Sequence, residues 1–220
     1  FTGEHITRFD LKSLDTTNLQ IYVSSDYAVT EEGQGDNPDW TVHQVWGVDH
    51  ERNIYLLDMW RGRTESDQWI LRWIGLVLKW KPLRAFEESG QILKSVGPMI
   101  RAMMQKHNAY VDRVQMTSTT DKPSRAQALL GWGAMGKLFI PTEKSTPEAW
   151  LPHLEAFLVE LRQFPTGRKD DTVDAASLFA RGLDRVVDGT APPRKSSPHG
   201  DSLDDLWSRH ESSKKRRDER

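Results

Sequence analysis

The segment LQIYVSSD, residues Leu19 to Asp26, begins the part of the sequence that is most informative about the fold. It is a β-branched apolar run that ends in an aspartate, and WTVHQVWGVD (Trp40 to Asp49) follows it with the alternation of a strand. A third run, NIYLLDMWRG (Asn53 to Gly62), comes after only a short polar turn. Connections this short join antiparallel strands, so the stretch predicts a three-stranded meander.

The chain after this meander alternates helical and strand-like segments. A helix is expected over Asp67 to Trp80, where tryptophan and aliphatic residues recur at helical spacing before Pro82. We expect the other elements in this order: a strand over 82–88, a helix from Gly90 to Asn108, a strand over 109–118, a helix from near Pro123, a strand over 137–141, a helix from about Pro147 to Phe164, and a last helix from Asp170 to about Val187. This order predicts an α/β fold, a mixed sheet in which parallel strands follow the antiparallel meander and helices flank the sheet.

The residues from Gly189 onward differ in composition from the rest of the chain. They include three prolines and few apolar residues, with eight basic and six acidic side chains. Such a composition favours disorder, so we expect one domain over residues 1–188 and a disordered, charged tail over 189–220. The formal net charge of −2 then divides into about −4 for the domain and about +2 for the tail.

Composition excludes several classes of protein. The absence of cysteine excludes disulfides, thiol nucleophiles and cysteine-based metal sites, and it favours a reducing compartment. No apolar run approaches the roughly 18 residues of a membrane span. The sequence has neither the GxxxxGK[ST] phosphate loop nor the GxSxG serine motif, and its seven histidines have no metal-binding spacing. Because the chain starts at Phe1 without a methionine, we expect it to be a piece of a longer soluble protein.

Carboxylates at the ends of apolar segments are the candidates for chemistry: Asp26, Glu87, Glu88, Asp170, Asp171 and Asp174. One aspartate at the start of a helix is explained by capping and by the helix dipole. Asp170 and Asp174 stand at i, i+4, where like charges cost about 0.2 to 0.5 kcal/mol in an isolated helix. A bound cation would offset this cost, and oxygen donors without histidine or cysteine favour Mg²⁺ or Mn²⁺ over zinc.

Four segments resemble the nuclease domain of the large terminase subunit of tailed bacteriophages, an RNase H-like, RuvC-type endonuclease. They are IYVSSDYA, RAFEESGQ, TTDKPSRAQALLGWGAMGKLFIP and FPTGRKDDTVDAA, in the family's order, and they span roughly Leu19 to Ala180. The order of strands and helices also resembles the RNase H-like fold. Two positions depart from the family's pattern, because Tyr27 precedes Ala28 and Lys169 replaces a frequent histidine.

The resemblance implies a site with two Mg²⁺ or Mn²⁺ ions. The implied catalytic ligands are Asp26, Glu87 and Asp170, with Asp171 as a further metal ligand. Glu87 is preferred because it directly follows the apolar Phe86; Glu88 is held in reserve, and Asp174 is expected to support the ligands. The residues expected near DNA phosphates are Lys122, Arg125, Arg168 and Lys169.

The activity implied by the resemblance is metal-dependent cutting of concatemeric double-stranded viral DNA during genome packaging, by two-metal-ion phosphodiester hydrolysis. The implied partners are double-stranded DNA, an ATPase domain in the same full-length chain, the portal and a small terminase subunit, in the host cytoplasm and without a membrane. Three alternatives stay open: a RuvC-like junction resolvase, an RNase H-type nuclease, and a non-catalytic docking module of the packaging motor.

Overall fold

The computed structural model describes residues 3–28, 39–117, 122–167 and 169–188. The strands are β1 (Thr7–Phe9), β2 (Gln20–Asp26), β3 (Thr41–Val48), β4 (Ile54–Gly62), β5 (Arg84–Ser89), β6 (Asp112–Thr117) and β7 (Leu138–Pro141). The α-helices are α1 (Ser66–Trp80), α2 (Gln91–His107), α3 (Lys122–Ala134), α4 (Leu151–Gln163) and α5 (Asp171–Asp188). Three short 3-10 helices are η1 (Gly3–His5), η2 (Leu11–Ser13) and η3 (Glu143–Ser145).

The chain divides into two units, residues 1–186 and 187–220. The second unit lies almost wholly outside the described residues, so the disordered tail over 189–220 stays a prediction. None of the helices in the described part is both long enough and apolar enough to cross a lipid bilayer.

All seven strands join one sheet in the order β1-β7-β4-β3-β2-β5-β6. β2, β3 and β4 pair antiparallel, which confirms the predicted meander. β5 pairs parallel to β2, and β6 pairs parallel to β5. β7 pairs parallel to β4 at the other side of the meander. The sheet is therefore mixed, as the alternation of segments predicts.

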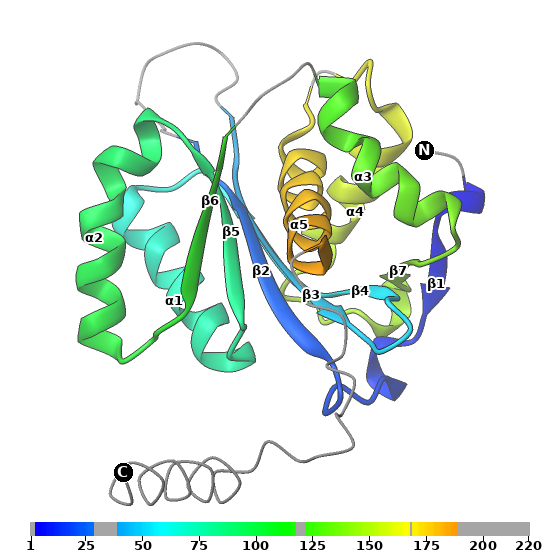
Figure 1. Cartoon of the computed structure of the whole chain (residues 1–220), viewed down its shortest axis with the longest axis horizontal. Helices are drawn as coiled ribbons and strands as arrows, with labels where there is room; N and C mark the ends of the chain where they lie inside the picture. Colours follow the sequence, from blue (N-terminus) through cyan, green and yellow to red (C-terminus); the bar gives the residue numbers. More distant parts are fainter. Residues whose placement is uncertain (1–2, 29–38, 118–121, 168, 189–220) are drawn as a thin grey trace, which may run out of the picture. The chain divides into compact units, whose positions relative to one another are not determined.

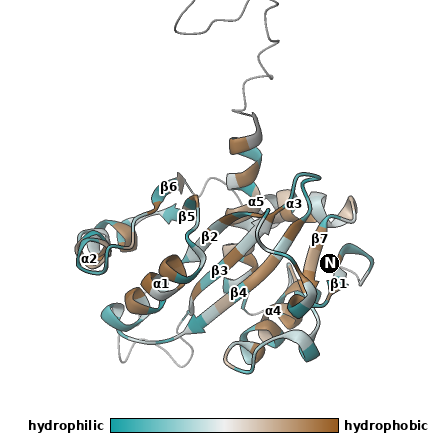
Figure 2. Cartoon of the chain, turned by 90° about the horizontal axis from the view of Figure 1, so that it is seen from below, coloured by the Kyte–Doolittle hydropathy of each residue, from teal (hydrophilic) through white to brown (hydrophobic). Residues whose placement is uncertain are grey.

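Helices cover both faces of this sheet, with α1 and α2 on one face and α3, α4 and α5 on the other (Figure 1). The tryptophan and isoleucine stripe of α1 is buried against β2, β3 and β4 as its spacing predicts. Figure 2 shows hydrophobic colouring concentrated on strands such as β4 and β7 and on one side of α1. Burial of these apolar surfaces between the layers drives the assembly of the fold.

Helix α5 packs closely on the central strands. The Phe179 ring of α5 stacks on Trp46 of β3 with centroids 4.9 Å apart, and it lies 6.1 Å from the ring of Tyr22 on β2. A Cβ atom added at Gly182 would lie 2.5 Å from the Phe86 ring, so only glycine allows this approach. The contacts fix α5 over β2, β3 and β5, and this places the start of the helix at one end of the sheet.

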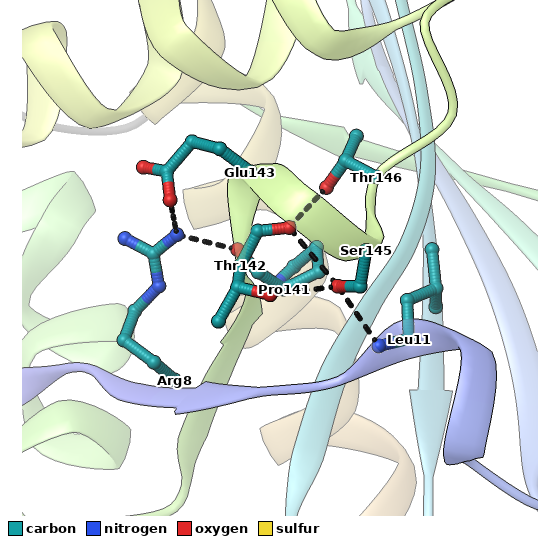
Figure 3. A network of polar contacts seen from close by, with 7 residues as sticks. All are labelled: Arg8, Leu11, Pro141, Thr142, Glu143, Ser145 and Thr146. Atoms are coloured by element: carbon teal, nitrogen blue, oxygen red, sulfur yellow. Dashed lines mark hydrogen bonds and ion pairs between the residues drawn. The ribbon is translucent and has the colours of Figure 1, made fainter.

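The edge strand β1 has no counterpart among the predicted elements. It is three residues long and pairs parallel to β7. The Arg8 guanidinium donates to the carbonyl oxygen of Pro141 at 2.6 Å and to Glu143 at 2.8 Å, and the Leu11 amide donates to the Ser145 hydroxyl at 3.1 Å (Figure 3). These contacts, 133 to 135 residues apart in sequence, hold the strand. A strand so short has no readable alternation, which is why its sequence does not reveal it.

Candidate metal centre

The carboxyl ends of β2 and β5 bring two acidic side chains to the same end of the sheet. Ser25 of β2 pairs with Glu87 of β5 in a parallel register. Asp26 and Glu88 are the next residues along, so they are neighbours across the two strands. Side chains in register on parallel strands point to the same face, and alternate residues share a face. Asp26 and Glu88 therefore lie on the face of Tyr22 and Phe86, which α5 covers.

Glu87 lies on the opposite face of the sheet. Its side chain is fully buried, with both carboxylate oxygens bonded to the Arg113 guanidinium at 2.9 to 3.1 Å. Its Oε1 also accepts a hydrogen bond of 2.7 Å from the Tyr27 hydroxyl. Glu87 therefore has a structural role, as the buried charge partner of Arg113. The geometry thus places Glu87 and Asp26 on opposite faces of the sheet. It favours Glu88 over Glu87 as the candidate metal ligand next to Asp26.

The start of α5 is fixed over the strand ends by buried polar contacts. The side-chain amide of Gln44 on β3 donates to the carbonyl oxygen of Thr172 at 3.0 Å. Glu160 of α4 accepts from the Thr172 amide at 2.9 Å and also from the Thr172 hydroxyl. Glu160 in turn pairs with Arg61 of β4 at 2.9 Å. Since a helix leaves its first amides without intrahelical partners, Glu160 satisfies one of them and anchors the turn.

Glu88 and Asp174 line the same small hollow, of about 10 Å³, together with Ser177, Leu178 and Arg181. The amide of Asp174 donates to the carbonyl oxygen of Asp170 at 2.8 Å, which links the two predicted residues through the first turn of α5. A space of roughly 10 to 15 Å³ holds about one water molecule. The hollow is therefore close to the size of a single small ion.

Asp171 is buried in the first turn of α5, and its Oδ2 has no hydrogen-bond partner among the described residues. Burial raises the pKa of Asp171 to about 6; the charges of Asp39 and Glu160 add to the rise, and Lys169 opposes it. Leaving a buried acceptor unsatisfied costs about 1 to 3 kcal/mol, and more for a charged group. A cation at this end of the helix would remove that cost.

Basic residues and Trp40 lie near Asp171. The guanidinium carbons of Arg61 and Arg63 lie 4.1 and 4.0 Å from the centroid of the Trp40 ring. Lys169 pairs with Asp39. Sequence patterns did not single out Trp40, Arg61 or Glu160, because each lies inside an ordinary strand or helix pattern. Only the pairing of distant segments brings them to the start of α5.

The structure describes only some of the four residues that are predicted to contact DNA. Lys169 is partly buried beside the acidic pair, as its sequence position suggests. Arg168 lies outside the described residues. The backbone of Lys122 and Arg125 forms the first turn of α3, and their side chains lie outside the described part. The roles of all four residues in DNA binding stay predictions.

The side chains at this end of the sheet offer carboxylate oxygens and no histidine or cysteine. Such oxygen donors prefer a hard divalent cation. The unpartnered Oδ2 of Asp171 fits such an ion, whereas the hollow of Glu88 and Asp174 is also lined by the basic Arg181. In the part of the chain that the structure describes, no three acidic or histidine side chains are arranged closely enough to hold a metal. Asp26 and Glu88 thus follow neighbouring strand ends and Asp170 and Asp171 begin α5, but among the described residues they do not form a metal-binding cluster.

Comparison with solved structures gives similar folds. The human cytomegalovirus terminase nuclease domain, Mn-soaked and inhibitor-bound, is 13% identical; the match covers 81% of this chain and 90% of that one, with a TM-score of 0.55. The large terminase nuclease of the thermophilic phage G20c with bound magnesium is 18% identical, covering 75% and 82%, with a TM-score of 0.51. This chain has the terminase nuclease fold. The prediction of an RNase H-like mixed sheet is confirmed.

The overall sequence similarity to these structures is low. A scan against protein-family models finds no match for this chain, and neither does a search among curated proteins. The terminase nuclease fold therefore persists here at identities below 20%. The candidate metal ligands lie at the carboxyl ends of β2 and β5 and at the start of α5.

Proposed function

We propose that this protein is a metal-dependent endonuclease that cuts concatemeric double-stranded viral DNA during genome packaging. One observation supports the proposal: the register of β2 and β5 brings Asp26 beside Glu88 at the carboxyl ends of these strands, on the face that α5 covers, and α5 begins with the buried Asp170 and Asp171. Structures of the same fold contain magnesium in one case and were soaked in manganese in another, and this supports a divalent cofactor here.

The residues have separate roles in this proposal. Asp26, Glu88 and Asp170 bind two Mg²⁺ or Mn²⁺ ions, and Asp171 is a further ligand whose buried, unpartnered oxygen is satisfied by an ion. Asp174 lines the same hollow as Glu88 and would support the ligands from there. The chemistry that two such ions supply is activation of a water molecule and stabilisation of the departing 3′ oxygen. We prefer Glu88 to Glu87 because the ion pair with Arg113 occupies both oxygens of Glu87.

The structural anchors explain how the ligands are held before an ion binds. Glu160 fixes the first turn of α5 through Thr172, and the register of β2 and β5 fixes Asp26 beside Glu88. Ligands on packed strands and helices are positioned more precisely than ligands on loops. Ion binding then requires only side-chain movement, and we expect the carboxylates to converge when it occurs.

The proposed partners follow from the same reasoning. Double-stranded DNA is the substrate, bound mainly through phosphates, since cutting during packaging must tolerate many sequences. Lys122, Arg125, Arg168 and Lys169 would contact its backbone. An ATPase domain in the same full-length chain, the portal and a small terminase subunit would complete the packaging machine in the host cytoplasm.

The test is plasmid nicking in Mn²⁺ by the wild type, by Asp26→Asn and by Asp170→Asn. We expect each variant to lose about 100-fold or more in rate, because even the outer partners of metal ligands cost 10- to 100-fold. Asp112→Asn is the matched control, since Asp112 begins β6 at the opposite end of the sheet. Wild-type cutting by Asp26→Asn would overturn the proposal.

Two further measurements sharpen this test. An ion that binds only the folded state raises its melting temperature, so Mn²⁺ should stabilise the wild type and Asp112→Asn but not Asp26→Asn. An absent shift in the wild type would favour a docking module without a metal. Linear duplex, a four-way junction and an RNA–DNA hybrid should be compared as substrates, because preference for the junction or the hybrid would refute double-stranded packaging DNA.

A further inference from the structure

A second polar cavity, of about 210 Å³, opens between helix α2 and the ends of β5 and β6. Its lining residues are Ser89, Gly90, Leu93, Lys94, Gly97, Pro98, Arg101 and Gln115. Gln115 is the register partner of Glu87, and Ser89 lies two residues after Glu87, so both belong to the face opposite Asp26 and Glu88. This cavity is therefore separate from the candidate metal centre.

The cavity has a positive charge that nothing in its lining neutralises. Lys94 and Arg101 stand seven residues apart on α2, which places them on one side of the helix. Among the described residues, no acidic side chain lines the cavity, and neither Lys94 nor Arg101 forms an ion pair. The nearest buried acid, Glu87, is already neutralised by Arg113. The lining is thus suited to an anion.

The walls of the cavity also supply neutral hydrogen-bond donors. Ser89 offers a hydroxyl and Gln115 an amide, and both complement the oxygens of a phosphate. Gly97 is buried between the two basic residues, and a Cβ atom at this position would lie 3.6 Å from Nη1 of Arg101. The Arg101 guanidinium therefore lies over a gap that a glycine leaves in the helix surface. Arginine and lysine with a hydroxyl and an amide form a typical phosphate-binding set.

The position of the cavity relates it to the metal centre. Ser89 directly follows Glu88 in β5, so the two sites share one end of the strand and lie on opposite faces of it. A polyanion lying across this end of the sheet passes both sites. DNA offers such a series of phosphates, whereas a small phosphorylated ligand would occupy one site only.

We propose that the cavity formed by Ser89, Lys94, Arg101 and Gln115 binds a backbone phosphate of the DNA duplex next to the phosphodiester that is cut. This proposal rests on the proposed endonuclease function. It assigns to α2 the task of fixing the path of the duplex, while the carboxylates on the other face of β5 act on the bond. Binding through a phosphate gives position and affinity without reading sequence.

The experiment measures binding of a fluorescent duplex by anisotropy, without divalent metal, over a series of salt concentrations. The test variant is the full chain with Lys94→Gln and Arg101→Gln. The matched control carries Arg72→Gln and Lys106→Gln, two exposed basic residues outside the cavity. We expect the test variant to bind about tenfold more weakly, with its salt slope reduced by about one, and the control to resemble the wild type. Equal affinities and slopes in the two double variants would overturn the proposal.

A third variant separates loss of the cavity from loss of folding. Gly97→Ala retains both charges but adds a methyl group at the floor of the cavity, and alanine favours a helix interior over glycine by up to about 1 kcal/mol. We expect Gly97→Ala to melt no lower than the wild type and yet to bind the duplex more weakly. Unchanged affinity in this variant, with its melting temperature maintained, would contradict a phosphate at this position.

Two arms distinguish the possible outcomes. If inorganic phosphate stabilises the wild type through Lys94 and Arg101 while duplex affinity does not depend on them, the cavity binds a free phosphate and the DNA proposal is overturned. The proposed nuclease function fails by a different result, namely normal cutting by Asp26→Asn. Asp26→Asn should bind the duplex with a wild-type dependence on Lys94 and Arg101, because its carboxylate lies on the other face of the sheet.

Discussion

Glu87 and Glu88 are adjacent in the chain, but their side chains lie on opposite faces of the sheet. Glu87 is fully buried with Arg113 beneath α1 and α2, whereas Glu88 lines a hollow with Asp174 of α5. The pleat of strand β5 produces this separation, because successive side chains point in opposite directions. The two glutamates therefore have different tasks, one in the stability of the sheet and one in the candidate metal centre.

The first prediction compares Glu87→Gln with Glu88→Gln. Glu87→Gln leaves the buried Arg113 without its charge partner, which typically costs about 3 to 5 kcal/mol. Glu88→Gln leaves the core unchanged and should lower the free energy of unfolding little, while nicking in Mn²⁺ is lost. Urea denaturation and plasmid nicking on both variants measure the two effects. A stable Glu87→Gln that cannot cut, next to a Glu88→Gln that cuts normally, would make Glu87 the ligand.

A double variant checks the cause of the instability. Replacing a buried ion pair by apolar residues of similar size is often neutral or stabilising. Glu87→Leu combined with Arg113→Met should therefore recover part of the stability that Glu87→Gln loses. If the double variant is less stable than both Glu87→Leu and Arg113→Met, the instability of Glu87→Gln does not come from the loss of the ion pair with Arg113.

Local sequence patterns were sufficient for the order of strands and α-helices from β2 onward. The meander, the parallel strands after it and the buried stripe of α1 all depend on apolar periodicity within one segment. The choice between Glu87 and Glu88 depends instead on which face of β5 meets α5. That face is set by the register with β2, about 60 residues earlier in the chain. Adjacency to Phe86 could not reveal it.

The supporting residues of the site were missed for a related reason. Glu160 lies in an amphipathic helix, where a glutamate is usually a solvated residue. Its partner Arg61 is 99 residues away in the sequence, so no local pattern marks either as buried. The candidate ligands Asp170 and Asp171 are easier to propose from the sequence, because the acidic residues at the start of α5 exceed what capping requires.

The second prediction concerns Glu160, which joins α4, β4 and the start of α5. Glu160→Gln removes the charge that pairs with Arg61, although the amide retains an oxygen for the Thr172 amide. We expect the free energy of unfolding to fall by about 3 kcal/mol or more, since the Arg61 charge stays buried. Nicking should also fall, because the first turn of α5 holds Asp170 and Asp171. Thermal melting and nicking rates measure both effects.

Glu155→Gln is the control for this second prediction. Glu155 lies on the same helix but is exposed, so its substitution should change neither stability nor cutting appreciably. The role assigned to Glu160 fails if the two variants behave alike. It also fails in part if Glu160→Gln is unstable but cuts at the wild-type rate under conditions in which it remains folded.

The third prediction uses the close packing of α5 on β5. In Gly182→Ala the added Cβ would lie 2.5 Å from the Phe86 ring, so the helix or the ring must move. Overpacking of this kind costs about 1 to 3 kcal/mol. Gly75→Ala in α1 has no atom within 4 Å of its new Cβ and should instead stabilise the fold. Opposite shifts in urea midpoint are expected, and equal shifts would contradict the packing argument.

A rescue variant localises this effect. Phe86→Leu shortens the side chain that Gly182→Ala meets, so the two changes together should destabilise the protein less than the sum of each alone. Contacting residues commonly show a coupling of about 0.5 to 3 kcal/mol in such a cycle. Strict additivity would mean that the Cβ of Ala displaces the helix without pressing on Phe86.

The fourth prediction concerns pH and depends on His43, which is fully buried on β3. Its Nε2 lies 3.2 Å from the carbonyl oxygen of Trp69, so this nitrogen donates, and its Nδ1 accepts from the Ser25 hydroxyl at 3.0 Å. The neutral ring is thus satisfied at both nitrogens. Burial lowers the pKa of His43 from its ordinary 6.5 to about 3, against the opposing effect of its backbone contacts.

The pKa of His43 is lower in the folded state than in the unfolded state, so the unfolded chain takes up the proton first as pH falls. Stability is then complete above the unfolded pKa of 6.5 and decreases as pH falls from there towards 3. A single proton contributes a slope of at most about 1.4 kcal/mol per pH unit. Urea denaturation of the wild type between neutral and mildly acidic pH should show this loss.

His43→Gln should be less stable at neutral pH but should lack this part of the pH slope. His50→Gln is the control, because His50 is exposed on the turn between β3 and β4. If the wild type and His43→Gln lose stability in parallel as pH falls, His43 is not the group that titrates.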